Sequence, residues 1–267
     1  MSTATLTAPV AAPPTSNFAR DVGIVMVREL RPVLHDPFSL IFGMIQPLVF
    51  LALFGPLLAG SVGTAIGGDV WGWFVPAILV MTALFGTSTT GANLLFELQT
   101  GAHERMLVTP LPRSALLVGR ALKEMVPLTG QAVIIVAVML PFGLRVDALG
   151  VLVGLVVLAV FGVGLGSLSY ALAVAVRKQE WMFWAVQQTL LFPLMILSGM
   201  LLPLETGPAW MRVVSDFNPL AHVVAAERAL FAGEFLTGAV LAGVLSAAAT
   251  AAVGLLVGIR VMERSAD

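Results

Sequence analysis

Six long apolar blocks, free of charged side chains, determine what this chain can fold into. They cover residues 38–60, 71–96, 125–143, 149–176, 181–202 and 235–259, and none contains Asp, Glu, Lys, Arg or His. Even the shortest, about 19 residues, would reach roughly 28 Å as a helix, close to the hydrocarbon thickness of a bilayer, about 30 Å. The sequence therefore predicts an all-α integral membrane protein with six transmembrane helices.

The composition and the absence of known motifs argue against several classes of function. Of the 267 residues, 58% are hydrophobic and only 11% are charged, against about 25% in soluble domains. A net charge of -1 offers no basic face, so we expect no nucleic-acid partner. The chain has no Cys and only three scattered His, and it lacks the Gly-x4-Gly-Lys-Ser/Thr run that grips nucleotide phosphates. We expect a non-catalytic chain that binds no metal and no cofactor of its own.

Basic residues are distributed unequally between the segments that connect the blocks. Eleven of the 14 Lys and Arg fall on one side of the predicted topology: Arg20, Arg28, Arg31, Arg105, Arg113, Arg120, Lys123, Arg177, Lys178, Arg260 and Arg264. The other three, Arg145, Arg212 and Arg228, fall on the opposite side. Because positive charge is retained in the cytoplasm, this asymmetry predicts a multi-pass protein of the bacterial cytoplasmic membrane with both termini inside.

The region before the first block predicts a tail and a helix. Residues 1–16 are uncharged, rich in Ala, Pro and Thr, and lack the pattern of a secretory signal, so we expect a disordered tail before a single domain at 17–267. Residues 17–36 predict an amphipathic helix at the membrane interface. We expect Asn17 to cap it, Val22, Val25, Met26 and Leu30 to form its apolar face, and Pro32, Asp36 and Pro37 to end it. The alternative is a short helix packed on its own chain.

Two further stretches interrupt the apolar pattern. Residues Glu97 to Glu124 carry three Glu, three Arg, one Lys and one His, and Pro110 and Pro112 predict a turn at residues 108–113. We interpret this stretch as a helical hairpin in the cytoplasm that presses on a soluble partner; the alternative is that its charges only solvate a loop end. Residues 197–231, broken by three Pro, predict two short helices that dip into the outer leaflet; the alternative is an ordinary extracellular loop.

The apolar blocks also bear on the energy source. With no ionisable residue inside them, the sequence offers no proton relay, so we expect another subunit to supply the energy. Glycines recur within 149–176, and Gly254 and Gly258 lie four residues apart in the last block. Small residues at such spacing allow helices to approach closely, either within the chain or at a dimer seam.

These features together resemble the membrane-spanning permease subunit of ABC-2 type exporters, similar to permeases of the daunorubicin-resistance type. The hairpin matches through Glu104, Arg105, Thr109, Pro110, Leu111, Arg113 and Lys123. The later stretch matches through Ser198, Gly199, Pro203, Pro208, Trp210, Asn218, Pro219, Leu220 and Arg228. The resemblance covers nearly the whole chain from Asn17 onward.

The resemblance implies the partners and the site residues. Coupling to a separate ATPase subunit, which binds ATP and Mg, would use Glu104, Arg105, Thr109, Pro110 and Arg113. An outer re-entrant motif would comprise Ser198, Gly199, Pro203, Trp210, Asn218, Pro219 and Arg228. A second permease copy or a sister permease would complete the transporter, which would contact membrane lipid and export a hydrophobic drug, antibiotic or lipid-like substrate. The rival hypotheses are an ion-coupled secondary carrier and a non-transporting membrane scaffold.

Overall fold

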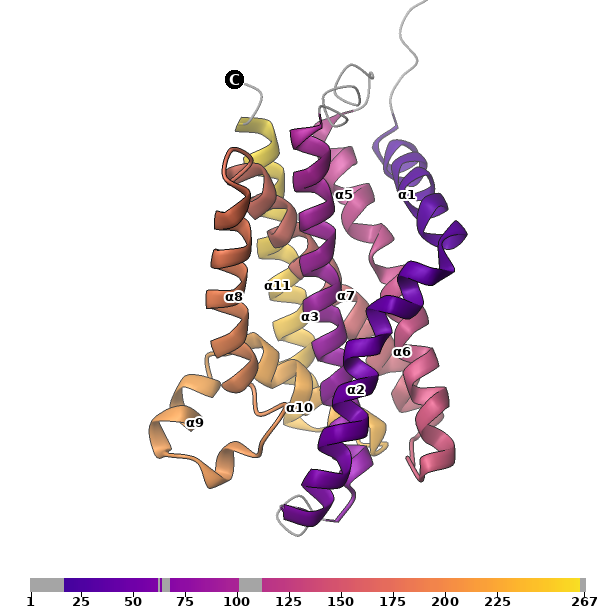
Figure 1. Cartoon of the computed structure of the whole chain (residues 1–267), viewed down its shortest axis with the longest axis vertical. Helices are drawn as coiled ribbons and strands as arrows, with labels where there is room; N and C mark the ends of the chain where they lie inside the picture. The colour runs from indigo at the N-terminus through magenta and orange to yellow at the C-terminus, as the bar shows by residue number, and fades with distance from the viewer. Residues whose placement is uncertain (1–16, 62, 64–67, 101–111, 265–267) are drawn as a thin grey trace, which may run out of the picture.

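The computed structural model describes residues 17–61, 63, 68–100 and 112–264, and the regular secondary structure within these ranges is entirely helical (Figure 1). The helices are α1 (Phe18–His35), α2 (Pro37–Ser61), α3 (Val70–Gln99), α5 (Arg113–Lys123), α6 (Met125–Met139), α7 (Ala148–Ala175), α8 (Glu180–Ile196), α9 (Ala209–Ser215), α10 (Pro219–Phe231) and α11 (Gly238–Arg264). Two short 3-10 helices, η1 (Leu140–Phe142) and η2 (Leu204–Thr206), lie in the connections.

Five segments of the described chain are long and apolar enough to cross a membrane. They are Ile41–Ser61, Val70–Gln99, Ser114–Phe142, Ala148–Ala175 and Gly238–Arg264. The predicted block 181–202 is helical only as far as Ile196, so α8 has 17 residues. Its apolar run continues, but the backbone turns at Gly199, whose φ of 69° is a left-handed conformation that glycine adopts without strain.

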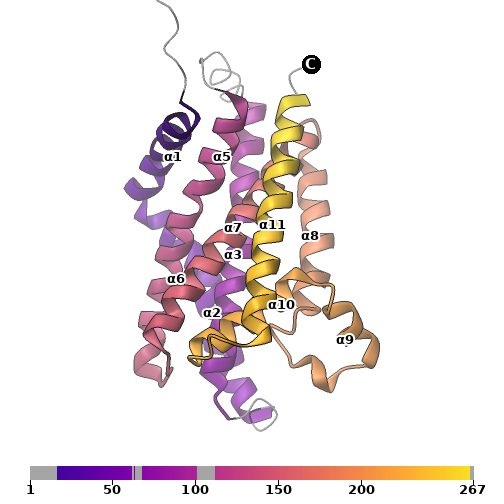
Figure 2. The same cartoon turned by 180° about the vertical axis from the view of Figure 1, so that it is seen from behind.

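The long helices run between two ends of the molecule (Figures 1 and 2). One end, which we call the basic end, holds the start of α1, the end of α3, the start of α5, the α7–α8 turn and the end of α11. The opposite end holds the start of α3, η1, α9 and α10. The described Lys and Arg of the larger predicted group belong to α1, α5, the α7–α8 turn and the last residues of α11, whereas Arg145, Arg212 and Arg228 belong to the opposite end.

Residues 114–124, the second half of the predicted cytoplasmic hairpin, do not protrude from the bundle as a hairpin would but pack within it. Helix α5 packs against α1, α7 and α11 and continues with a bend into α6. Leu116 and Leu117 are buried, as are Arg120 and Glu124. The charged side chains are accommodated because each finds a partner on another helix, which the linear sequence does not reveal.

Close glycine contacts join α7 to α11, which pack along one another (Figure 2). A Cβ on Gly254 would meet the backbone of Gly164, and a Cβ on Gly164 would meet the backbone of Thr250 and Ala251. Any larger residue would separate the two helices. The small residues of these two blocks therefore serve packing within the chain at this point.

Helix α1 begins at the predicted cap and ends within the predicted range 17–36, at His35 with Asp36 as its C-cap. Asn17 caps it by accepting from the Ala19 N–H at 3.2 Å, and Val22 and Val25 are buried against α5, where Gly119 gives them room. Pro32 lies inside the helix, which continues to His35, so Pro32 does not end it. Helix α1 thus packs on its own chain, while Ile24, Val27 and Leu34 remain exposed on another face.

Candidate coupling and transport site

A buried guanidinium joins three helices at the basic end. Arg120 of α5 is 2% exposed, and its Nη2 donates to Oε2 of Glu97 at 2.6 Å and to Oε1 of Glu29 at 3.3 Å. Glu97 lies in the last turn of α3, and Glu29 lies on α1. Hydrogen bonds between ionised groups are roughly twice as strong as neutral ones. Arg120, in the last turn of α5, therefore ties α5 to α1 and to the end of α3.

The predicted coupling residues fall between these two helices. Glu104, Arg105, Thr109 and Pro110 lie in 101–111, outside the described residues. Arg113 is the first residue of α5. The described residues on either side, Thr100 and Pro112, flank α3 and α5 at the basic end, and Arg120 contacts Glu97, three residues before Thr100. A coupling role for the five residues stays a prediction, and Arg120 is the nearby residue that the sequence pattern did not single out.

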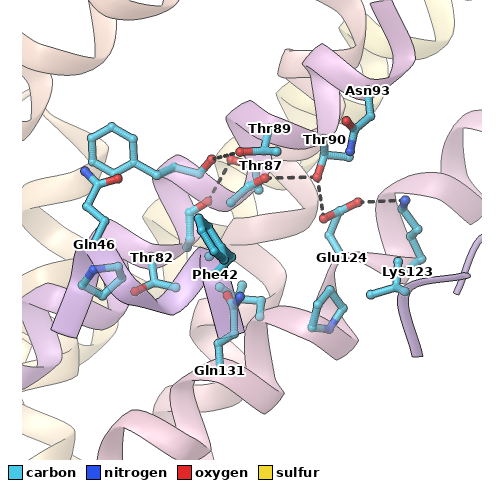
Figure 3. Close-up of a pocket in the computed structure, with 18 residues that line it drawn as sticks. Phe42, Gln46, Thr82, Thr87, Thr89, Thr90, Asn93, Lys123, Glu124 and Gln131 are labelled. Carbon is cyan, nitrogen blue, oxygen red and sulfur yellow. Dashed lines mark hydrogen bonds and ion pairs between the residues drawn. The ribbon is translucent and has the colours of Figure 1, made fainter. Parts of the chain in front are cut away.

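A polar cavity lies between α2, α3 and the bend that joins α5 to α6 (Figure 3). Its volume is about 250 Å³. Its polar lining comprises Gln46 of α2, five residues of α3 (Thr82, Thr87, Thr89, Thr90 and Asn93), and Lys123, Glu124 and Gln131 of the α5–α6 arm. Phe42 and Pro47 of α2 supply apolar parts of the wall. Polar groups at membrane depth ordinarily face a bundle interior or a cavity, so this lining marks a candidate ligand site.

Glu124, in the cavity wall, makes two hydrogen bonds and one ion pair. The side chain is almost fully buried, and its Oε2 accepts from Thr90 Oγ1 at 2.8 Å. Its Oε1 accepts from the Tyr170 hydroxyl at 3.3 Å and lies 3.6 Å from Lys123 Nζ. The carboxylate is thus compensated by three groups from α3, α7 and α5. Glu124 directly precedes the predicted block 125–143, which itself holds no ionisable residue, and the bend from α5 into α6 buries it within the bundle.

At the opposite end, a second guanidinium is held without a carboxylate. Arg228 of α10 donates from Nε to the Trp73 carbonyl at 2.8 Å and from Nη2 to the Gly199 carbonyl at 3.0 Å. Its Cζ lies 3.8 Å from the centre of the Trp73 ring, a cation–π contact. Burial lowers the pKa of Arg228 to about 9, so the guanidinium keeps its charge at neutral pH. Trp73 was missed by sequence reasoning; its place beside Trp71 at the start of a predicted span was the available signal.

The outer motif residues divide into a connected group and one separate side chain. Asn218 caps α10 by accepting from the Leu220 N–H at 3.0 Å, and its Nδ2 donates to the Leu194 carbonyl of α8 at 2.7 Å. Pro219 is the first residue of α10, a position where its missing N–H costs nothing. Ser198 donates to the Met195 carbonyl at 2.7 Å, which helps turn the chain after α8, and Pro203 precedes η2. Trp210 lies apart on α9 and is 61% exposed.

A third buried charge-bearing group, Glu227, precedes Arg228 and points elsewhere. It is fully buried against Gly154 of α7, and neither carboxyl oxygen has a hydrogen-bond partner among the described residues. Burial raises the pKa of Glu227 to about 8, so the neutral acid is the stable form at neutral pH. Within the described ranges, no three His, Asp or Glu gather as metal ligands.

Comparison with known proteins assigns the family. The model of the ABC-2 type transporter family matches residues 20–232. The daunorubicin resistance ABC transporter permease protein DrrB1 of Streptomyces coeruleorubidus is 28% identical over 208 residues, which cover 77% of this chain and 73% of that protein. The putative transport permease ycf38 of Cyanophora paradoxa is 28% identical over 218 residues, or 80% and 75% of the two chains. The probable multidrug ABC transporter permease YbhR of Escherichia coli K12 is 25% identical over 153 residues, 56% and 41%. The chain belongs to the ABC-2 type transporter family and is a helical membrane protein of that family.

Proposed function

We propose that this chain is the permease subunit of an ATP-driven exporter in a bacterial cytoplasmic membrane. It would move a hydrophobic drug, an antibiotic or a lipid-like molecule outward, and a separate ATPase subunit would bind and hydrolyse ATP with Mg. The observation that carries the proposal is the family match over residues 20–232. The names of two relatives, which refer to daunorubicin resistance and to multidrug transport, support the substrate class.

We propose six crossings, with the basic end in the cytoplasm. Helix α8 has 17 residues, or about 26 Å, which falls at the short end of what a transmembrane helix needs. It runs from the basic end to the opposite end, as a crossing between α7 and α11 requires (Figure 1). The excess of Lys and Arg at the basic end supports its cytoplasmic placement and therefore cytoplasmic termini.

In this arrangement, α1 and α9 would lie at the two membrane–water interfaces. Helix α1 carries exposed Arg28 and Arg31 together with exposed Ile24, Val27 and Leu34, a mixture suited to the boundary between headgroups and acyl chains. Helix α9 and the residues after it expose Trp210, Val213 and Phe217, which suits a segment that dips into the outer leaflet. We infer that a second permease copy or a sister permease completes the substrate path, as in the family.

The Arg120 junction suggests how an ATPase could act on the spans. A partner that pushes segment 101–111 would displace the end of α3 and the start of α5, which flank it. Arg120 links those helices to α1 through Glu97 and Glu29, so the displacement would be shared by three elements. We propose that this junction passes the motion of the ATPase to the polar cavity, since Glu124 of the cavity wall lies four residues after Arg120.

Variants of segment 101–111 test the proposal. Arg105→Glu should weaken co-purification with the ATPase through charge repulsion, and added salt should partly restore it. The double variant Pro110→Ala and Pro112→Ala should keep the charges but misplace them, because the backbone is no longer forced to bend. Arg177→Glu, at the exposed α7–α8 turn of the same end, is the matched control. Normal assembly and normal substrate-stimulated ATP turnover in both test variants would show that this segment is not the coupling element.

An ion-coupled carrier is the second candidate function. The observation that favours it is the buried Glu124, whose carboxylate contacts Thr90 and Tyr170 within the bundle, since intramembrane acids often serve proton transfer. A proton gradient would then drive transport by the chain without ATP.

A further inference from the structure

The polar cavity between α2, α3 and the α5–α6 bend has a lining that specifies a kind of ligand. Its Lys123 and Glu124 form one pair, with Nζ and Oε1 3.6 Å apart, so these two charges balance. A charged ligand would be buried there without a counter-charge, which is costly in a low-dielectric site. The cavity therefore favours an uncharged ligand.

The remaining lining offers hydrogen bonds of both kinds. The hydroxyls of Thr82, Thr87 and Thr89 donate to carbonyls of their own helix at 2.9–3.2 Å, which leaves their oxygen lone pairs as acceptors. Gln46 and Asn93 are exposed side chains on the cavity wall, and neither makes a hydrogen bond within the part of the chain that the structure describes. Each primary amide supplies a carbonyl acceptor and two N–H donors.

Size and position complete the description. A volume of about 250 Å³ has room for about eight waters at roughly 30 Å³ each, and is smaller than typical pockets for drug-sized ligands, about 300–1,000 Å³. The wall residues Thr82 and Asn93 lie eleven positions apart on α3, or about 16 Å, so the cavity extends from mid-helix toward the basic end. Next to the wall residue Phe42, α2 exposes Phe38, Ile41 and Ile45, an apolar surface on which an acyl chain could lie.

We propose that this cavity binds the uncharged hydroxyl- or amide-bearing headgroup of an amphiphile, whose apolar tail lies along α2. The inference rests on the proposed function for placing the cavity within the bilayer. The ligand has two possible sources, a resident membrane lipid and the exported molecule, and both would be recognised by the same chemistry.

Photolabelling of the purified chain in phosphatidylcholine nanodiscs tests the proposal without ATP or a partner. The probes are three amphiphiles with one diazirine-bearing alkyl tail and different headgroups: glucoside, sulfate and trimethylammonium. The glucoside should label peptides of α2, α3 or α6, and unlabelled octyl glucoside should compete. The other two headgroups should label these peptides weakly. Equal labelling by all three headgroups would overturn the proposal.

Two kinds of variant identify the cavity as the site. The double variant Gln46→Leu and Asn93→Leu should weaken glucoside binding by about tenfold or more, because each lost hydrogen bond is worth about fivefold. Gln188→Leu, an exposed amide on α8 outside the cavity, should have no effect. Gly86→Leu should fill the cavity, since Gly86 lines it and a Cβ there meets no atom within 4 Å. Gly130→Leu, equally open but outside the cavity, is its control.

The outcomes separate this inference from the proposed function. Unchanged glucoside labelling in Gly86→Leu, in protein of normal helicity, would overturn the cavity site even if ATP-driven export is intact. Labelling that persists in a chain that never assembles with an ATPase would support the cavity while refuting the exporter. Where an ATPase does assemble, weaker labelling on irradiation during ATP turnover identifies an exported amphiphile. Labelling of unchanged strength identifies a resident lipid. Both results support the site.

Discussion

The two ends of the molecule hold their arginines by different means. At the basic end, Arg120 is buried and its partners are two carboxylates from other helices, of which Glu97 is one-third exposed. At the opposite end, Arg228 is held by two backbone carbonyls and the face of Trp73, with no ion pair within the described residues. Side-chain carboxylates can swing away into water, whereas carbonyls of packed segments cannot. The contacts at the basic end can therefore rearrange more readily than those at the opposite end, as the proposed function requires.

The largest expected effect concerns which end faces the cytoplasm. Since the chain has no native Cys, single cysteines can be labelled without background. Gly67→Cys, in the segment between α2 and α3, should react on intact cells with a thiol reagent that does not cross membranes. His103→Cys, between α3 and α5, should react only after the cells are opened. The reverse pattern would invert the topology. The basic end would then lie outside the cell, where a cytoplasmic ATPase could not act on it.

Loss of the Arg228 contacts should have the next largest effect. Arg228→Leu removes two hydrogen bonds from a charged donor and one cation–π contact, so we expect a destabilisation of about 3 kcal/mol and a melting midpoint lower by ~5–10 °C. Arg228→Lys should recover only part of this loss, because an ammonium cannot reproduce the planar fork. Arg212→Leu, exposed on α9, is the matched control. Equal melting of Arg228→Leu and the control in detergent would show that the outer network does not fix this end.

Loss of the Arg120 junction should destabilise the chain less than loss of the Arg228 contacts, and its two charges should be exchangeable between Arg120 and Glu97. Arg120→Leu should cost about 1–2 kcal/mol, less than a fully buried pair, since Glu97 and Glu29 are partly solvated. Arg120→Glu combined with Glu97→Arg should restore part of the loss relative to Arg120→Glu alone, whereas the outer end offers no such exchange. A double-mutant cycle on the melting midpoint measures the coupling. Coupling near zero would mean that this ion pair does not join the helices.

The smallest effect within any one pH unit is a pH dependence of stability at the opposite end. Burial raises the pKa of Glu227 from 4.5 to about 8, so between these values the folded chain holds a proton that the unfolded chain has released. The free energy of unfolding should therefore fall as pH rises through this window, by about 1 kcal/mol per pH unit, and level off above pH 8. Glu227→Gln should remove that contribution. Identical pH dependences of melting for the variant and the parent would contradict the assignment of a neutral Glu227.

The sequence was sufficient where local chemistry decides the structure. Uninterrupted apolar runs located α2, α3, α7 and α11, and Asn17 marked the start of α1. Hydropathy could not place the end of α8, because the apolar run continues past Ile196; Ser198 and Gly199 were the available turn signal.

The buried charges could not be predicted, because their partners are distant in the chain. Arg120 meets Glu29 across 91 positions, and Arg228 meets Trp73 across 155. Without knowledge of such a partner, a charged residue is expected to be exposed to solvent. For the same reason the cavity was hidden: Gln46, Asn93 and Glu124 come from three separate segments and are polar neighbours only in the folded chain.

Reconstitution with a partner tests the central claim, that a separate ATPase drives this chain from its basic end. The measurement is uptake of a fluorescent hydrophobic drug into inside-out proteoliposomes that contain the chain alone, the chain with an ion gradient, or the chain with its ATPase and ATP. We predict uptake only with the ATPase and ATP, and a parallel loss of uptake in Arg105→Glu. Uptake driven by an ion gradient without ATP, or ATP hydrolysis by the purified chain alone, would contradict this account.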